Sequence, residues 1–190
     1  MSSRSSAHRF TDDALRHVAQ GVVSRVAHLE APIVLIDGRS GAGKTSLAHA
    51  VASLSRMPGK VLSLDDVYPG WDGLEAATRL VAEEILPALR AGRAARWRGW
   101  DWERSAPGSW HIAEPGGLWV IEGCGALTAD TRRNADWTVW VDGPEAVRKQ
   151  RALARDGEGY APWWDRWADQ ESAHIADHAP QNWADEEVSL

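Results

Sequence analysis

The stretch IVLIDGRSGAGKT, residues 33–45, decides the fold that we expect for this chain. Ile33 to Ile36 form a short continuous apolar run, which is typical of a buried parallel strand. Gly38 to Thr45 then match the pattern G-x-x-x-x-G-K-[S/T] completely. The pattern lies between this predicted strand and a helix predicted over residues 46–55. We therefore interpret it as a phosphate-binding loop (P-loop) and not as a chance glycine-rich turn.

Each residue type in the loop suits the binding of phosphates. Glycines let the backbone fold tightly with its N–H groups pointing inward, and the following helix adds the positive end of its dipole. We expect Lys44 to reach the β and γ phosphates and Thr45 to offer its hydroxyl to Mg²⁺. The residues expected around the nucleotide are Gly38, Ser40, Gly41, Ala42, Gly43, Lys44, Thr45 and Ser46. The sequence thus predicts ATP, or another nucleoside triphosphate, as a cofactor together with Mg²⁺.

The rest of the chain alternates between strand patterns and helix patterns. Apolar runs predict further strands at 60–64, 118–121 and 137–141, with a weaker candidate at 187–190. Helical spacing predicts helices at 11–30, 74–89, 144–155 and 163–178, the first capped by Thr11 and the second kinked or stopped near Pro87. Residues 91–117 look irregular. This alternation indicates an α/β fold with a parallel sheet covered on both faces, in one domain spanning 1–190.

Composition narrows the functional class. The formal net charge is -6, which argues against a surface that coats nucleic acid. Cys124 is the only cysteine, so no internal disulfide and no zinc site of several thiolates can form, and a reducing cytoplasm is the expected setting. We find no apolar run of the roughly 18–20 residues that a bilayer span needs, and expect no membrane partner. An exposed tryptophan patch could form a homodimer contact.

Carboxylates follow two of the predicted strands at the edge where ligands bind in α/β folds. Asp65 and Asp66 come directly after the strand at 60–64, and Asp65 is our first choice as the base that orients an attacking hydroxyl. Glu122 occupies the Walker B position after the strand at 118–121. Either Asp65 or Glu122 could hold the magnesium with Thr45. The alternative is that these carboxylates only cap turns.

Three arginines share one face of the helix predicted at 144–155. Arg148, Arg151 and Arg155 recur at helical spacing, and arginines on such a face can bind phosphate oxygens and stabilise the charge of a transferring phosphoryl group. Arg148 is expected on the nucleotide, and Arg151 and Arg155 in catalysis. The glycines that follow predict a lid over about 148–162. The alternative is a solvated basic face.

Aromatic, cationic and acidic side chains gather in the region from about 68 to 117, which suits the binding of a polar ring or sugar. The expected acceptor contacts are Asp66, Tyr68, Trp71, Arg98, Trp100, Asp101, Trp102 and Gln170. The tryptophans could instead pack on the sheet and line nothing. The helix at 163–178, which carries Gln170, is expected to fold back over the cleft. His174 and His178 have metal-ligand spacing, but no third ligand is evident in the sequence.

These motifs, in this order, resemble the uridine kinase-like branch of the P-loop kinases. The residues that carry the resemblance are GRSGAGKT at 38–45, LDDVY at 64–68, WDW at 100–102, VIEG at 120–123 and RKQRALARD at 148–156. The resemblance implies a three-layer P-loop NTPase sandwich with a core of five parallel strands. It also implies phosphorylation of a small-molecule hydroxyl by a nucleoside triphosphate, with Asp65 as base and WDW on the acceptor. Trp100 stands where uridine kinases carry tyrosine.

Three functions remain open on the sequence. The leading one is a kinase of a nucleoside-like small molecule. A nucleoside monophosphate kinase would need extra arginines such as Arg79, Arg96 or Arg98 near Asp65 to bind the acceptor phosphate. A regulatory ATPase would have no small-molecule acceptor and would act through a protein partner.

Overall fold

The structure, a computed structural model, describes residues 3–190, and of residues 3–12, 156 and 158 it describes the backbone alone. At its centre is a five-stranded sheet in the order β2-β5-β1-β6-β7. All its strand pairs are parallel. The strands are β1 Ile33–Gly38, β2 Gly59–Ser63, β5 Leu118–Glu122, β6 Trp137–Asp142 and β7 Glu186–Ser189. The predicted α/β class with a parallel sheet is confirmed, including the weak strand near the end of the chain.

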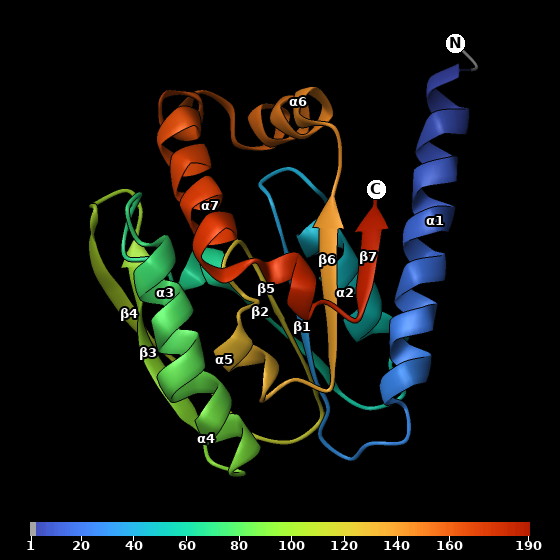
Figure 1. The fold of residues 1–190 in the computed structure, drawn as a ribbon, viewed down its shortest axis with the longest axis vertical. Helices are drawn as coiled ribbons and strands as arrows, with labels where there is room; N and C mark the ends of the chain where they lie inside the picture. The colour runs from blue at the N-terminus through green and yellow to red at the C-terminus, as the bar shows by residue number, and fades with distance from the viewer. Residues whose placement is uncertain (1–2) are drawn as a thin grey trace.

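Helices cover both faces of the sheet and make three layers (Figure 1). On one face lie α1 Ser3–Val26 and α2 Lys44–Leu54. The other face is covered by α3 Leu74–Leu80, a π-helical turn Val81–Ile85, α4 Leu86–Arg90 and α7 Trp164–His178. Two more helices are α5 Ala129–Arg132 and α6 Glu145–Asp156. The π-helical turn just ahead of Pro87 is the interruption predicted for the helix at 74–89, because proline supplies no N–H for the regular ladder.

Two hydrophobic cores result from the alternation of side chains along the central strand. Every residue of β1 is buried. Val34 and Ile36 belong to the core under α1 and α2, whereas Ile33 and Leu35 belong to the core on the opposite face. Successive side chains of a strand point to opposite faces, so a strand with helices on both sides must be apolar throughout. The continuous apolar run at 33–36 therefore indicates a strand in the middle of the sheet.

The first helix differs from its prediction at both ends. It begins at Ser3, so the cap expected at Thr11 is wrong, and it ends at Val26, earlier than residue 30. The polar segment before Thr11 contains no glycine or proline, and a helix that has started gains a backbone hydrogen bond with every residue added. The expected packing role is confirmed, since Val22 and Val26 are buried against the α2 side of the sheet.

The segment predicted to be irregular forms a β-hairpin. β3 Ala95–Asp101 and β4 Ala106–Ala113 pair antiparallel in a separate two-stranded sheet. Along β3, Ala95, Trp97 and Gly99 are buried, whereas Arg96 and Arg98 are exposed. This alternation with a period of two is typical of a strand. It is hard to recognise in the sequence because arginine and glycine are not typical strand residues.

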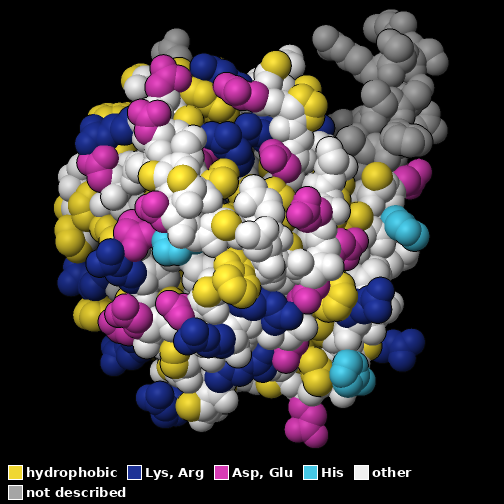
Figure 2. Space-filling model, viewed as in Figure 1, with side chains coloured by type: hydrophobic (Ala, Val, Ile, Leu, Met, Phe, Trp, Pro, Cys, Tyr) yellow, Lys and Arg dark blue, Asp and Glu magenta, His cyan; other side chains and the backbone are white. Residues whose placement is uncertain are grey.

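Charged side chains of both signs are interspersed over the face of the molecule shown in Figure 2. Hydrophobic side chains appear between them in small groups on the same face. Among the described residues, the helices are too short or too polar for any of them to cross a bilayer.

Candidate nucleotide and phosphoryl-transfer site

The P-loop connects β1 to α2 at the carboxyl edge of the sheet, and its glycines are required by the geometry. Gly38, Gly41 and Gly43 have φ angles of 146°, 76° and 104°, in the region that residues other than glycine rarely adopt. A Cβ on Gly41 would lie 2.1 Å from the backbone oxygen of Arg148, and one on Gly38 would lie 1.9 Å from that of Val141. The loop is therefore pressed against the chain around β6 and α6.

Lys44 is buried at the start of α2, and its ammonium group is held inside the loop. Its Nζ donates to the backbone oxygen of Arg39 at 3.1 Å and lies 3.5 Å from Cys124 Sγ. Burial opposes its charge, but acidic neighbours outweigh burial and hold the pKa of Lys44 above its ordinary value. Burial raises the pKa of the Cys124 thiol, which is neutral at neutral pH. The carboxylates of Glu122 and Glu171 therefore supply the charge that keeps Lys44 protonated.

Thr45 and Glu122 meet at the predicted magnesium position. The Thr45 hydroxyl donates to Glu122 Oε1 at 3.1 Å. Glu122 ends β5 next to β1, and its side chain is 2% exposed. A hydroxyl and a carboxylate are hard oxygen donors of the kind that Mg²⁺ takes in nucleotide sites. These two residues, which the sequence places 77 positions apart, therefore fit the ion that the P-loop motif implies.

The loop also binds a carboxylate that our sequence analysis did not assign to it. Glu171, from α7, accepts a hydrogen bond from the Ser40 backbone N–H at 2.7 Å and pairs with Arg39 at 3.2 Å. Burial would raise the pKa of Glu171, but hydrogen bonds from Ser40 and the charge of Lys44 lower it below its ordinary value. The P-loop thus already holds an anionic group. The expectation that this helix folds back over the cleft is consistent with these contacts.

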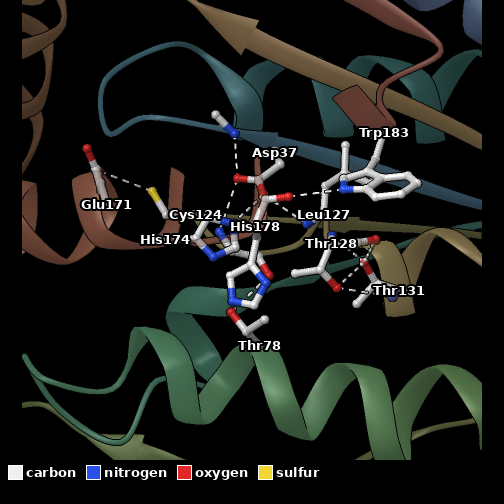
Figure 3. Close-up of polar contacts among 12 residues, drawn as sticks. Asp37, Thr78, Cys124, Leu127, Thr128, Thr131, Glu171, His174, His178 and Trp183 are labelled. Atoms are coloured by element: carbon white, nitrogen blue, oxygen red, sulfur yellow. Dashed lines mark hydrogen bonds and ion pairs between the residues drawn. The ribbon is translucent and has the colours of Figure 1, made fainter. Parts of the chain in front are cut away.

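Asp37, the residue just before the loop, is a second group that sequence reasoning missed. Its carboxylate accepts hydrogen bonds from the backbone N–H groups of Gly38, Gly125 and Leu127. Its Oδ2 also lies 3.5 Å from His174 Nε2 (Figure 3). Asp37 therefore fixes the loop after β5 beside the P-loop. Its position directly before Gly38, at the end of an apolar run, was the available signal.

The two aspartates after β2 occupy a short 3₁₀ turn, Leu64–Asp66, and both are exposed. Ser63 caps this turn by accepting from the Asp65 N–H. The backbone oxygens of Asp65 and Asp66 accept hydrogen bonds from the indole N–H groups of Trp102 and Trp97. The hairpin is therefore anchored on the turn that carries the predicted base.

An aromatic cluster covers this edge. Trp71 stacks on Tyr160 and Trp163 at centroid distances of 5.5 Å and 5.4 Å, and Trp102 meets it edge-on at 4.9 Å. Tyr68 is fully buried beneath the cluster, where its hydroxyl donates to the Cys124 backbone oxygen at 2.8 Å. The cluster joins the loop after β2, the hairpin and the segment ahead of α7. Trp102 is 38% exposed and Trp71 is partly exposed, whereas Tyr68 lies within the core, so contacts of Trp71 and Trp102 with an acceptor stay predictions.

The remaining predicted acceptor residues are engaged with neighbouring backbone. Trp100 packs beside Gly70, and Asp101 accepts from the Arg104 N–H at 2.9 Å. Arg98 donates to the backbone oxygens of Gly108 and Pro107 across the hairpin. Gln170 donates to the Trp71 backbone oxygen and accepts weakly from the Leu74 N–H. Their roles toward an acceptor stay predictions.

Two of the three arginines of α6, Arg148 and Arg151, have different partners. Arg148 is 4% exposed and donates to the backbone oxygens of Gly143 and Ser40, so it braces the P-loop from behind. Arg151 donates to the backbone oxygen of Leu190 at 2.9 Å. Arg155 is exposed near the end of the helix. On this helix face, Arg148 thus contacts the P-loop and Arg151 contacts the end of the chain.

Two solved structures resemble this chain over nearly its whole length. No protein-family model and no curated protein matches the sequence. A solved structure of a possible uridine kinase from Bacillus stearothermophilus has a TM-score of 0.70 and 18% identity, covering 94% of this chain and 99% of that one. A protein proposed to be a fructose transport system kinase, from Silicibacter sp. TM1040, has a TM-score of 0.56 and 19% identity over 92% and 98% of the two chains. The chain therefore shares the α/β fold of these two solved structures.

Proposed function

We propose that this protein is a kinase that transfers the γ-phosphoryl group of ATP, or another nucleoside triphosphate, to a hydroxyl of a small molecule. The observation that carries the proposal is the contact of Thr45 with Glu122 beside the buried ammonium group of Lys44. A hydroxyl, a carboxylate and a cation at the mouth of a P-loop are the groups that phosphoryl transfer uses. Mg²⁺ would neutralise charge on the transferred group when bound.

Each residue has a distinct role in this proposal. The loop backbone from Gly38 to Thr45 cradles the phosphates, and Lys44 compensates their charge. Asp65 orients the acceptor hydroxyl and takes its proton, because it lies exposed at the carboxyl edge of β2. Glu122 and Thr45 hold the metal ion. Glu171 leaves the Ser40 N–H when the γ-phosphate takes its place, since two anions cannot share one donor.

A nucleoside-like acceptor is the class that we propose. The stacked rings of Trp71, Tyr160 and Trp163 beside the exposed edge of Trp102 support a flat, polar ligand. A monophosphate acceptor gains no support. Arg96 and Arg98 point to the face of β3 opposite Trp97, whose indole contacts Asp66, and Arg79 pairs with Glu75. We therefore favour an uncharged acceptor over one that already carries phosphate.

The test is ADP release by purified protein with ATP and Mg²⁺ across a panel of nucleosides, nucleoside monophosphates, sugars and vitamins. A nucleoside is expected to raise turnover well above the rate without acceptor. Asp65→Asn is expected to abolish the rise, by about 10²-fold or more, since a positioned base contributes about 10²–10⁴-fold.

Asp66→Asn is the matched comparison, because Asp66 lies in the same turn and is also exposed to solvent. Because Asp66 is an expected acceptor contact and not the proposed base, Asp66→Asn is expected to raise the KM for the acceptor and to leave kcat largely unchanged. If Asp66→Asn is inactive and Asp65→Asn is active, the base has been assigned to the wrong residue. If ATP binds but no compound raises ADP release, the kinase proposal fails and a regulatory ATPase takes its place.

A further inference from the structure

Three side chains that suit a metal ion meet between α3 and α7, away from the P-loop. Glu75 comes from the first turn of α3, and His174 and His178 lie one turn apart on α7. One ligand atom from each lies within 4.8 Å of the other two. His178 Nε2 and Glu75 Oε2 are 3.4 Å apart, close to the spacing of two ligands held at about 2.0–2.2 Å from one tetrahedral ion. The third ligand that the sequence did not reveal is thus supplied by the fold.

His174 is the member of the cluster whose buried ring nitrogens have no hydrogen-bond partner among the described residues. It is 5% exposed. Buried polar groups are nearly always paired, because leaving one unpaired costs free energy. Its Nε2 lies 3.5 Å from Asp37 Oδ2 without forming a hydrogen bond to it. A metal-bound histidine typically turns its second ring nitrogen to a carboxylate in this way, which leaves Nδ1 for the ion.

The surroundings leave room for an ion and for water. Glu75 and His178 border a cavity of about 380 Å³ that also reaches Thr78 and Thr128. Arg79 holds the other carboxylate oxygen of Glu75, Oε1, at 2.8 Å, so Oε2 stays directed at the histidine. Glu75 and His178 are partly exposed, whereas His174 is buried behind them. An ion could therefore enter from the cavity and keep a water molecule on that side.

We propose that Glu75, His174 and His178 form a binding site for a divalent metal ion of the zinc type, completed by water. Two imidazoles and one carboxylate form a donor set that suits zinc. The ion would join α7 to α3. Because Glu171 lies one turn from His174 on the same face of α7 and contacts Ser40, the ion would also hold α7 against the P-loop.

Zinc binding to the whole purified chain, freed of metal by a chelator and containing no nucleotide, tests this proposal. Calorimetric titration is expected to show about one Zn²⁺ per chain. His178→Gln and Glu75→Gln, each at a partly exposed position, are expected to weaken binding by about tenfold or more. His49→Gln changes an exposed histidine on α2 and is the control, which is expected to bind zinc as the parent does.

Cobalt provides a measurement that needs no variant. Co²⁺ bound by two imidazoles and a carboxylate in a four-coordinate site is expected to give intense visible absorption, which Zn²⁺ then displaces. The proposal is overturned if the parent binds no zinc at about 100 μM. It is also overturned if His178→Gln and Glu75→Gln, checked for folding by circular dichroism, bind zinc as tightly as the parent. None of these readouts depends on kinase activity.

Discussion

Gly41 has no side chain, and the backbone around it leaves no space for one. Its φ of 76° is in the left-handed region, and the Arg148 backbone oxygen lies 2.1 Å from where a Cβ would be. Gly92 has a similar φ of 66°, but nothing lies within 4 Å of a Cβ built there. The two positions separate the cost of the backbone angle from the cost of the clash.

We predict that Gly41→Ala destabilises the protein considerably more than Gly92→Ala. The left-handed angle costs an alanine about 1–2 kcal/mol at either site, and forcing atoms into the P-loop costs about 1–3 kcal/mol more. Nucleotide binding is expected to be lost only in Gly41→Ala. Urea denaturation and ATP titration measure the two effects. Equal stability of the two variants would contradict the close packing of the loop on α6.

The ionised carboxylate of Glu171 makes stability depend on pH. Its pKa is lowered in the folded protein, despite burial, by Ser40 and Lys44. A lowered pKa means that the carboxylate stabilises the fold fully above its unfolded pKa, whose ordinary value is 4.5, and loses this effect as the pH falls through the folded value. The stabilisation is therefore present at neutral pH and lost in acid.

We predict that Glu171→Gln lowers the melting temperature at pH 7. We also predict that the variant loses less stability than the parent when the pH falls below about 4.5. A hydrogen bond to a charged group is worth about 1.5–3 kcal/mol, and the amide keeps only part of it. Thermal melts between pH 3 and pH 8 compare the variant with the parent. Exposed Asp169→Asn, on the same helix, is the control. Parallel stability curves for parent and Glu171→Gln would show that the carboxylate carries no such linkage.

At the scale of elements, α7 is the helix that brings the site together. Gln170 joins it to the loop after β2, Glu171 to the P-loop, and Trp167 to the core. Trp167 is 5% exposed and meets Tyr68 edge-on at 4.7 Å. The docking of α7 therefore depends on large buried rings as well as on its polar contacts.

We predict that Trp167→Ala destabilises the protein by about 3–5 kcal/mol, because a large cavity replaces the ring. Trp110 is 59% exposed on the hairpin, so Trp110→Ala is expected to change stability by about 0.5 kcal/mol or little more. Urea unfolding followed by circular dichroism measures both. Should the two variants unfold at the same urea concentration, α7 is not held by this packing.

At the scale of the whole molecule, the sequence predicts those features that are encoded locally. The three central strands of the parallel sheet, β5, β1 and β6, are mainly apolar runs, and the P-loop is a contiguous motif, so all of them could be predicted from the sequence. The hairpin β3–β4 was not predicted, because the alternating positions of β3 are occupied by arginine, glycine and tryptophan and not by the usual β-branched residues. The four-residue helix α5 was not anticipated, and it is too short to show a helical period.

The unpredicted parts of the site depend on how distant segments meet. Ser40 and Glu171 are 131 positions apart, and Thr45 and Glu122 are 77 apart. Only the second pair could be anticipated, because the carboxyl ends of parallel strands meet at a common edge. The path of α7 over that edge follows from the packing of its tryptophans. No local pattern in the sequence states which loop such a helix will reach.

The strand order has a consequence for the time at which the protein acquires its site during synthesis. β1 pairs only with β5 and β6, whose first residues, Leu118 and Trp137, leave the ribosome long after the P-loop does. At about 5–20 residues per second, the roughly 70 residues between the loop and β5 take about 4–14 seconds to translate. Throughout this interval the nascent chain carries the complete phosphate-binding motif without neighbours to brace it. ATP can therefore stabilise only chains long enough to include β5 and β6, and it cannot guide the earliest folding steps.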